Sequence, residues 1–238
     1  MTTDAALYRL LAWTSPGYPT GAFSYSHGLE WAVEAGEVRH LADLLEFVDA
    51  AISRGGGWVD AVLFAHTWRA AHDAATARAT TPAHAMTELR DLSQLAAAFR
   101  GSAEAALESH QQGAAFLQIT RRAWPHPLLD LFARHCGNEP VSHGSVVAIA
   151  CAAHDIALEP SLHAYLHAFA ANLVSAGARL IPLGQTDAQI AIASLIDPIH
   201  RVSERAMATD LEDLGSAAPG LELFSMLHET QYTRLFRS

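Results

Sequence analysis

Residues 41–53, with the sequence LADLLEFVDAAIS, show the pattern that runs through most of this chain. Their apolar members recur every three or four positions, at Leu41, Leu44, Leu45, Val48 and Ile52. This spacing places them along one face of a helix, and it returns at Leu162, Tyr165, Leu166, Phe169 and Leu173. Alternation with a period of two, which is typical of strands, is scarce, and the alanine-rich residues 95–115 favour helix. The sequence therefore predicts an all-α fold.

Glycine, proline, serine and asparagine clusters divide the pattern into about ten helices, followed by a short one at 221–228. The ten are expected at 4–13, 23–35, 41–53, 59–79, 83–99, 103–122, 127–135, 145–156, 161–181 and 187–214. Gly36 is expected to cap a helix, and Pro198 to kink or divide the last long one. Since no flexible linker or repeat divides the chain, we expect one globular domain over 1–230 and a separate tail over 231–238.

Composition excludes several classes of function. The formal net charge of -10 disfavours nucleic acid as a partner. All 15 basic residues are arginine, which excludes a Schiff-base lysine and the lysine of a phosphate-binding P-loop. Two cysteines are too few for a disulfide framework, and no apolar run approaches the ~20 residues of a membrane span. The first residues lack the positive charge of a secretion signal, so we expect a cytoplasmic protein without membrane contact.

The 14 histidines raise the question of a metal site. His163 and His167 lie four residues apart on an expected helix, but no glutamate follows His163 as a zincin motif requires, and no third ligand is identifiable. Cys151 and His154 share a helical face within an apolar run, where a buried structural thiol is the better interpretation. We therefore predict no metal site.

Catalytic signals are equally weak. Ser24, His27 and Glu30 have the spacing to share one helical face, yet a nucleophile elbow needs a strand before the serine, and this context is helical. The glycine run at 55–57 is a weak phosphate signal, because no lysine or dinucleotide-binding motif follows it. The sequence predicts no catalytic residue and no enzyme.

Two segments have compositions that do not suit a plain loop. Residues 15–30 mix aromatic side chains and a histidine with turn formers and hydroxyl residues, and residues 228–238 combine Tyr, Leu and Phe with two arginines. We expect the tail to be mobile in the free protein and ordered on a partner, the alternative being a tail folded onto its own core. The candidate partner-binding residues are Ser24, Tyr25, His27, Glu30, Gln231, Tyr232, Arg234, Leu235, Phe236 and Arg237.

With these segments the chain closely resembles the UreF family of urease accessory proteins. The resemblance is carried by Ser15-Pro16, Pro19, Gly21 and FSYSHGLE at 23–30, by Glu108-Ser109 with Gln112-Gly113, by RLIPLGQTD at 179–187, and by HE at 228–229 with QYTRLFRS at 231–238. One departure is Ala188, where the family pattern has glycine, and residues 70–82 and 125–143 show little that matches.

The resemblance implies an all-α, usually homodimeric protein with no cofactor and no catalysis of its own. Such a protein joins the GTPase UreG to UreD, also called UreH, on the urease apoprotein, and so couples GTP turnover to nickel insertion. Two alternatives stay open: a nickel-binding metallochaperone and a metal-dependent helical enzyme, both using the histidines. The metal content of the purified protein separates them from a scaffold, because both would hold about one ion tightly per chain.

Overall fold

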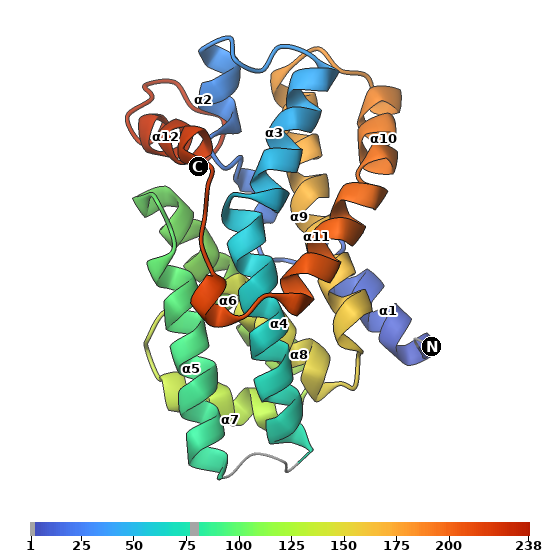
Figure 1. The fold of residues 1–238 in the computed structure, drawn as a ribbon, viewed down its shortest axis with the longest axis vertical. Helices are drawn as coiled ribbons and strands as arrows, with labels where there is room; N and C mark the ends of the chain where they lie inside the picture. The colour runs from blue at the N-terminus through green and yellow to red at the C-terminus, as the bar shows by residue number, and fades with distance from the viewer. Residues whose placement is uncertain (1–2, 77–80) are drawn as a thin grey trace.

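The computed structural model describes residues 3–76 and 81–238, and within these residues it contains helices and no strand (Figure 1). The all-α prediction is confirmed. The α-helices are α1 (Asp4–Trp13), α2 (Leu29–Glu34), α3 (Leu41–Ser53), α4 (Gly56–Ala75), α5 (Pro82–Ala98), α6 (Ala103–Ala123), α7 (Pro127–Cys136), α8 (His143–Ala153), α9 (Leu158–Leu180), α10 (Gln185–Ser194), α11 (Ile196–Ala208) and α12 (Pro219–His228). Two short 3-10 helices, η1 (Ala22–Ser24) and η2 (Leu211–Asp213), complete the set in the described residues.

Helices α4 and α8 form the centre of the molecule. Every residue of α8 from Gly144 to Ala153 is buried, and so is a continuous run of α4 from Gly57 to Ala65. A helix that is apolar on all sides needs neighbours all round, and α8 packs against α4, α6 and α9. Figure 1 shows α4 running along the long axis of the molecule, with the other helices around it. One contiguous core therefore supports the whole chain.

Helices with a local start signal were predicted best. The expected bounds 4–13 and 41–53 are those of α1 and α3, where Thr3 and His40 cap the first turns. The expected helix at 59–79 begins earlier, at Gly56, and ends at Ala75, and its expected residues 77–79 lie outside the described residues. The expected helix at 187–214 is divided: α10 ends at Ser194, four residues before Pro198, where the proline ring would meet the carbonyl group of a continuous helix.

The expected helix at 23–35 is wrong in its first half. After η1 the backbone is extended at Tyr25, and His27 and Gly28 have positive φ angles of 55° and 78°. Regular helix begins only at Leu29. Ser24, His27 and Glu30 therefore do not share a helical face. The irregular segment packs closely against α12 at Gly28. Helix α12 contacts α2 and α6 at one end of the molecule (Figure 1).

Candidate functional site

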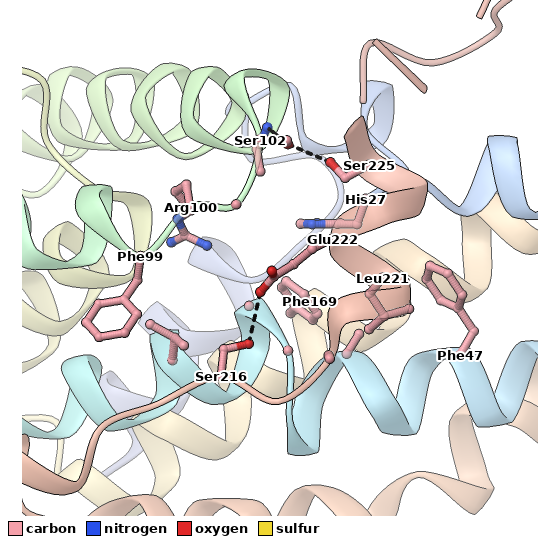
Figure 2. Close-up of a pocket in the computed structure, with 17 residues that line it drawn as sticks. His27, Phe47, Phe99, Arg100, Ser102, Phe169, Ser216, Leu221, Glu222 and Ser225 are labelled. Atoms are coloured by element: carbon pink, nitrogen blue, oxygen red, sulfur yellow. Dashed lines mark hydrogen bonds between the residues drawn. The ribbon is translucent and has the colours of Figure 1, made fainter. Parts of the chain in front are cut away.

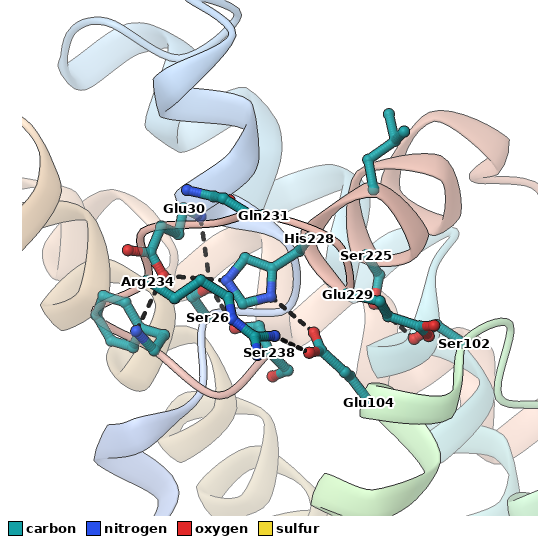
Figure 3. Close-up of polar contacts among 12 residues, drawn as sticks. Ser26, Glu30, Ser102, Glu104, Ser225, His228, Glu229, Gln231, Arg234 and Ser238 are labelled. Carbon is teal, nitrogen blue, oxygen red and sulfur yellow. Dashed lines mark hydrogen bonds and ion pairs between the residues drawn. The ribbon is translucent and has the colours of Figure 1, made fainter.

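The N-terminal segment and the C-terminal tail, some two hundred residues apart in sequence, lie side by side. The amide of Arg237 donates to the carbonyl oxygen of Ser24 at 2.8 Å, and the amide of Ser26 donates to the carbonyl oxygen of Ser238 at 2.6 Å. The Ser26 hydroxyl group donates to the same Ser238 oxygen (Figure 3). We call residues 24–30 the signature and residues 231–238 the tail, and we call these two segments and the side chains that join them the signature–tail junction.

Glu30 is the first anchor of the tail. Its carboxylate, only 7% exposed, accepts hydrogen bonds from the amides of Leu235 at 2.6 Å and Phe236 at 2.9 Å. It also lies 3.0 Å from Nε2 of His228, at the end of α12. Three donors from the C-terminal region thus converge on one buried carboxylate, which is how proteins accommodate a buried charge.

His228 is fully buried between two carboxylates. Its Nδ1 lies 2.6 Å from Glu104 on α6, and its Nε2 faces Glu30 on α2. Each ring nitrogen of His228 thus lies within hydrogen-bonding distance of a carboxylate oxygen. Arg234 of the tail pairs with the other oxygen of Glu104 (Figure 3). His228 therefore links α2, α6 and α12 at the base of the tail.

Glu108, one turn further along α6, is the second anchor. Its Oε2 accepts from the Ser238 hydroxyl group at 2.9 Å, and its Oε1 lies 3.1 Å from Nε2 of His27 and 2.8 Å from Nε2 of Gln112. Burial acts to raise the pKa of Glu108, but its interactions with His27, Ser238 and Arg100 lower it on balance. Glu108 therefore joins the signature to the tail as a carboxylate.

Apolar burial completes the junction. Phe236 is 3% exposed, and the guanidinium group of Arg179 lies 4.3 Å from its ring centroid. Arg179, on α9, also donates to the carbonyl oxygen of Phe23 at 2.9 Å. In this structure the tail is folded onto the chain's own helices, which is the alternative to a tail ordered only on a partner, because the chain supplies its own partners for the tail's aromatic ring and amides.

The predicted partner-binding residues differ in their exposure. Tyr25, Glu30 and Phe236 are buried and hold the junction together, and the Tyr25 hydroxyl group donates to Gln111 at 2.6 Å. By contrast Tyr232 is fully exposed and Leu235 is 66% exposed. Ser24 and His27 are half-buried in the signature, Gln231 is half-buried and bonds to Glu34, and Arg234 and Arg237 lie at the surface. Sequence reasoning assigned no role to Glu104, Glu108, Arg179 or His228.

A second buried network lies beside the first. Arg100 pairs with Asp60 and donates to the Ser109 hydroxyl group at 3.3 Å, while the Tyr165 hydroxyl group donates to Asp60 at 2.9 Å. Burial and the Asp60 carboxylate raise the pKa of Tyr165 well above its ordinary value. The hydroxyl group thus stays protonated and donates to Asp60.

The histidine and cysteine candidates do not form a metal centre with their neighbours. His163 faces His200 of α11, with ring centroids 5.4 Å apart, and within residues 3–76 and 81–238 no group of three or more His, Cys, Asp or Glu side chains could hold an ion. Cys151 is buried in α8, and burial raises the pKa of its thiol to about 12, so it is an inert structural residue. No described helix is long and apolar enough to cross a bilayer.

His143, at the start of α8, makes stability depend on pH. Burial lowers its pKa to about 4, so the unfolded chain, with a pKa near 6.5, binds more protons between these values. Stability should therefore fall as the pH falls from about 6.5 towards 4. Replacing His143 by Phe, which can pack on Phe116 and Tyr165, should remove about 2 kcal/mol of the stability difference between about pH 7 and pH 5. Urea denaturation at both pH values measures this.

The exposed His135 provides the matched control, because His135→Phe should leave the pH dependence unchanged. An unchanged pH dependence in His143→Phe would contradict the assignment of this titration to His143.

Comparison with known proteins identifies the family of this chain. The family model described as UreF matches residues 38–196, more than half of the chain. The chain belongs to the UreF family. Proteins named urease accessory protein UreF match along nearly the full length, including both segments of the junction. The chain is 50% identical over 238 residues to the protein of Granulibacter bethesdensis, covering 100% of this chain and 96% of the relative.

Two further relatives give the same result. The UreF protein of Rhodopseudomonas palustris strain TIE-1 is 46% identical over 235 residues, covering 99% of this chain and 93% of the relative. That of Bradyrhizobium diazoefficiens is 44% identical over 234 residues, covering 98% and 92%. Membership of this family makes the chain a non-catalytic urease accessory protein, involved in urease maturation.

Proposed function

We propose that this chain is a scaffold that links the GTPase UreG to UreD, also called UreH, on the urease apoprotein, and so couples GTP turnover to nickel insertion. In this proposal the chain works in the cytoplasm as a homodimer, without a cofactor of its own, and nickel is the cargo of the assembly. The observation that carries the proposal is the signature–tail junction, a rigid buried frame that presents exposed apolar side chains.

The exposed side chains suit binding of a partner protein. Tyr232 and Leu235 project from a tail whose intervening and following residues are fixed by Glu104 and Glu30. On α12, Leu223 and Met226 are spaced by three residues and about half exposed. Aromatic and apolar anchors held in one conformation lose little entropy on binding, which favours affinity. We assign UreD/UreH as the partner of this surface.

The test replaces the exposed anchors and leaves the frame intact. The double variant Tyr232→Ser with Leu235→Ser should bind UreD/UreH roughly 30-fold to 700-fold more weakly, because exposed hot-spot side chains contribute roughly 1 to 2 kcal/mol each. Its free energy of unfolding should change by no more than about 0.5 kcal/mol, since neither side chain is buried. Copurification, with urease activation measured in parallel, provides the readout.

Leu131→Ser is the matched control, because Leu131 is also exposed and belongs to α7, a helix at the opposite end of the molecule from the C-terminus (Figure 1). It should assemble and activate normally. A double variant that still assembles with UreD/UreH and UreG would refute the proposed surface, while stoichiometric nickel or GTP hydrolysis in the purified chain would refute the scaffold itself.

A further inference from the structure

A small cavity of about 70 Å³ lies beside the signature–tail junction, between the start of α4, the connection from α5 to α6, and α12, and His27 of the junction forms part of its wall (Figure 2). Its wall includes Gly55 and Gly56, members of the glycine run that the family assignment leaves unexplained. Arg100, Ser216 and Glu222 contribute polar groups to the same wall. The chemistry of these groups points to a ligand.

Arg100 turns unused donors towards this cavity. Its side chain is only 8% exposed, and Nη2 alone makes the contacts to Asp60 and Ser109. Its Nε is buried, and no described residue accepts a hydrogen bond from it. Nη1 lies 3.5 Å from the position that a β-carbon on Gly56 would occupy. A buried guanidinium group with donors left over is suited to an oxyanion.

The start of α4 adds a second set of donors. This helix is 20 residues long, and its N-cap Gly55 has no side chain with which to cap the first amides. Within the described residues no backbone carbonyl group accepts from the amide of Gly56, which lines the cavity. The amide dipoles give this end of the helix a partial positive charge, which favours an anion. Because glycine occupies position 56, a ligand can approach the backbone closely.

Glu222 restricts which anion fits. Its side chain extends from α12 into the space between Arg100 and Ser216, and its Oε1 accepts from the Ser216 hydroxyl group at 3.2 Å (Figure 2). The carboxylate of Glu222 would repel an anion that has no O–H group with which to donate a hydrogen bond. An oxyanion that keeps an O–H group can donate a hydrogen bond to Glu222 and turn its remaining oxygens towards Arg100. Bicarbonate and monohydrogen phosphate share this chemistry, and sulfate does not.

We propose that this cavity binds a small protonated oxyanion, held by Arg100 and the amide of Gly56 at the start of α4, with its hydroxyl group donating a hydrogen bond to Glu222. The site is independent of the scaffold role, because none of its residues belongs to the exposed surface assigned to UreD/UreH. Binding should be weak, in the millimolar range at about 4 kcal/mol, because Asp60 already offsets much of the charge of Arg100.

The experiment titrates the full chain with bicarbonate, inorganic phosphate or sulfate at constant ionic strength near pH 7.5. Amide resonances of Gly56 and Gly57 in the isotope-labelled protein report binding at the start of α4. Saturable shifts with bicarbonate, phosphate or both support the proposal and show which of these anions binds. Sulfate should bind at least about tenfold more weakly. If sulfate matches the others, or none saturates by about 50 mM, the site holds an adventitious ion only and the proposal fails.

Three variants localise the effect without disturbing the pair of Arg100 and Asp60. Gly56→Ala places a methyl group at ordinary contact distance from Arg100, so the fold is kept while the ligand's place is filled, and affinity should fall at least about fivefold. Gly220→Ala, in the first turn of α12 with open space around it, is the matched control and should bind normally. Glu222→Gln should admit sulfate as readily as phosphate. Unchanged anion preference in Glu222→Gln, or unchanged affinity in Gly56→Ala, would overturn the assignment.

Discussion

Replacing Glu30 by alanine should lower the free energy of unfolding by about 3 to 5 kcal/mol, because removal of one partner leaves a buried charge and buried donors without acceptors. The groups left behind are His228 and the amides of Leu235 and Phe236. Urea denaturation measures the loss. Hydrogen exchange at the two tail amides should also accelerate, which ties the loss to the tail.

Glu34→Ala is the control, because Glu34 lies one turn later on the same helix and is exposed, and it accepts only a solvent-exposed hydrogen bond from the Gln231 side chain of the tail. Its effect should stay within about 0.5 kcal/mol. Glu30→Gln should lower the free energy of unfolding by less than Glu30→Ala and by more than Glu34→Ala, since the amide keeps one acceptor oxygen but turns a donor towards other donors. It should weaken assembly without abolishing it. If Glu30→Ala unfolds at the same urea concentration as Glu34→Ala, the carboxylate does not anchor the tail.

Replacing Gly28 by alanine should destabilise the protein by about 2 to 5 kcal/mol through two effects. The φ angle of 78° is unfavourable for any residue with a β-carbon, by roughly 1 to 2 kcal/mol. The new carbon would also lie 2.6 Å from the backbone nitrogen of Ser225 and 2.8 Å from the carbonyl carbon of Phe224. Because both atoms belong to the backbone of α12, the helix itself would have to shift, adding about 1 to 3 kcal/mol. Thermal and urea unfolding both report the change.

Gly36 separates the two effects. Its φ angle of 77° is nearly the same, but no described atom lies within 4 Å of the position of its β-carbon. Gly36→Ala should therefore show only the backbone term of roughly 1 to 2 kcal/mol. Equal losses in the two variants would mean that the contact between Gly28 and α12 contributes nothing.

Local signals explain what was predictable from the sequence. The limits of α1 and α3 follow from a capping residue and a regular apolar spacing, both contained within the helix and its first neighbours. The division before Pro198 follows from the covalent structure of proline. Gly36 ends α2 in the left-handed conformation, as expected for a residue that follows a helix.

The junction could not be predicted in the same way. The role of Glu30 depends on His228, 198 positions later, and no spacing rule connects them. Gly28 is required by the backbone of α12, which a local pattern cannot show. The tail's composition indicated an interface, but composition does not distinguish a surface of another protein from one within the same chain. Only the structure separates the exposed side chains of the tail, Tyr232 and Leu235, from the buried one, Phe236.

The long sequence separation across the signature–tail junction sets the order in which a newly made chain can acquire its functional surface. Proteins emerge from the ribosome N-terminus first, so the helices around α4 can pack while the residues that complete the junction are still being added. Closing a loop of this length is entropically unfavourable, so it takes place only when contacts between its two ends offset the lost entropy. A nascent or prematurely terminated chain lacking residues 228–238 would expose Glu30, Glu104 and Glu108 instead of presenting Tyr232 and Leu235. If the proposed surface recruits a partner, only chains whose synthesis has passed that point can do so.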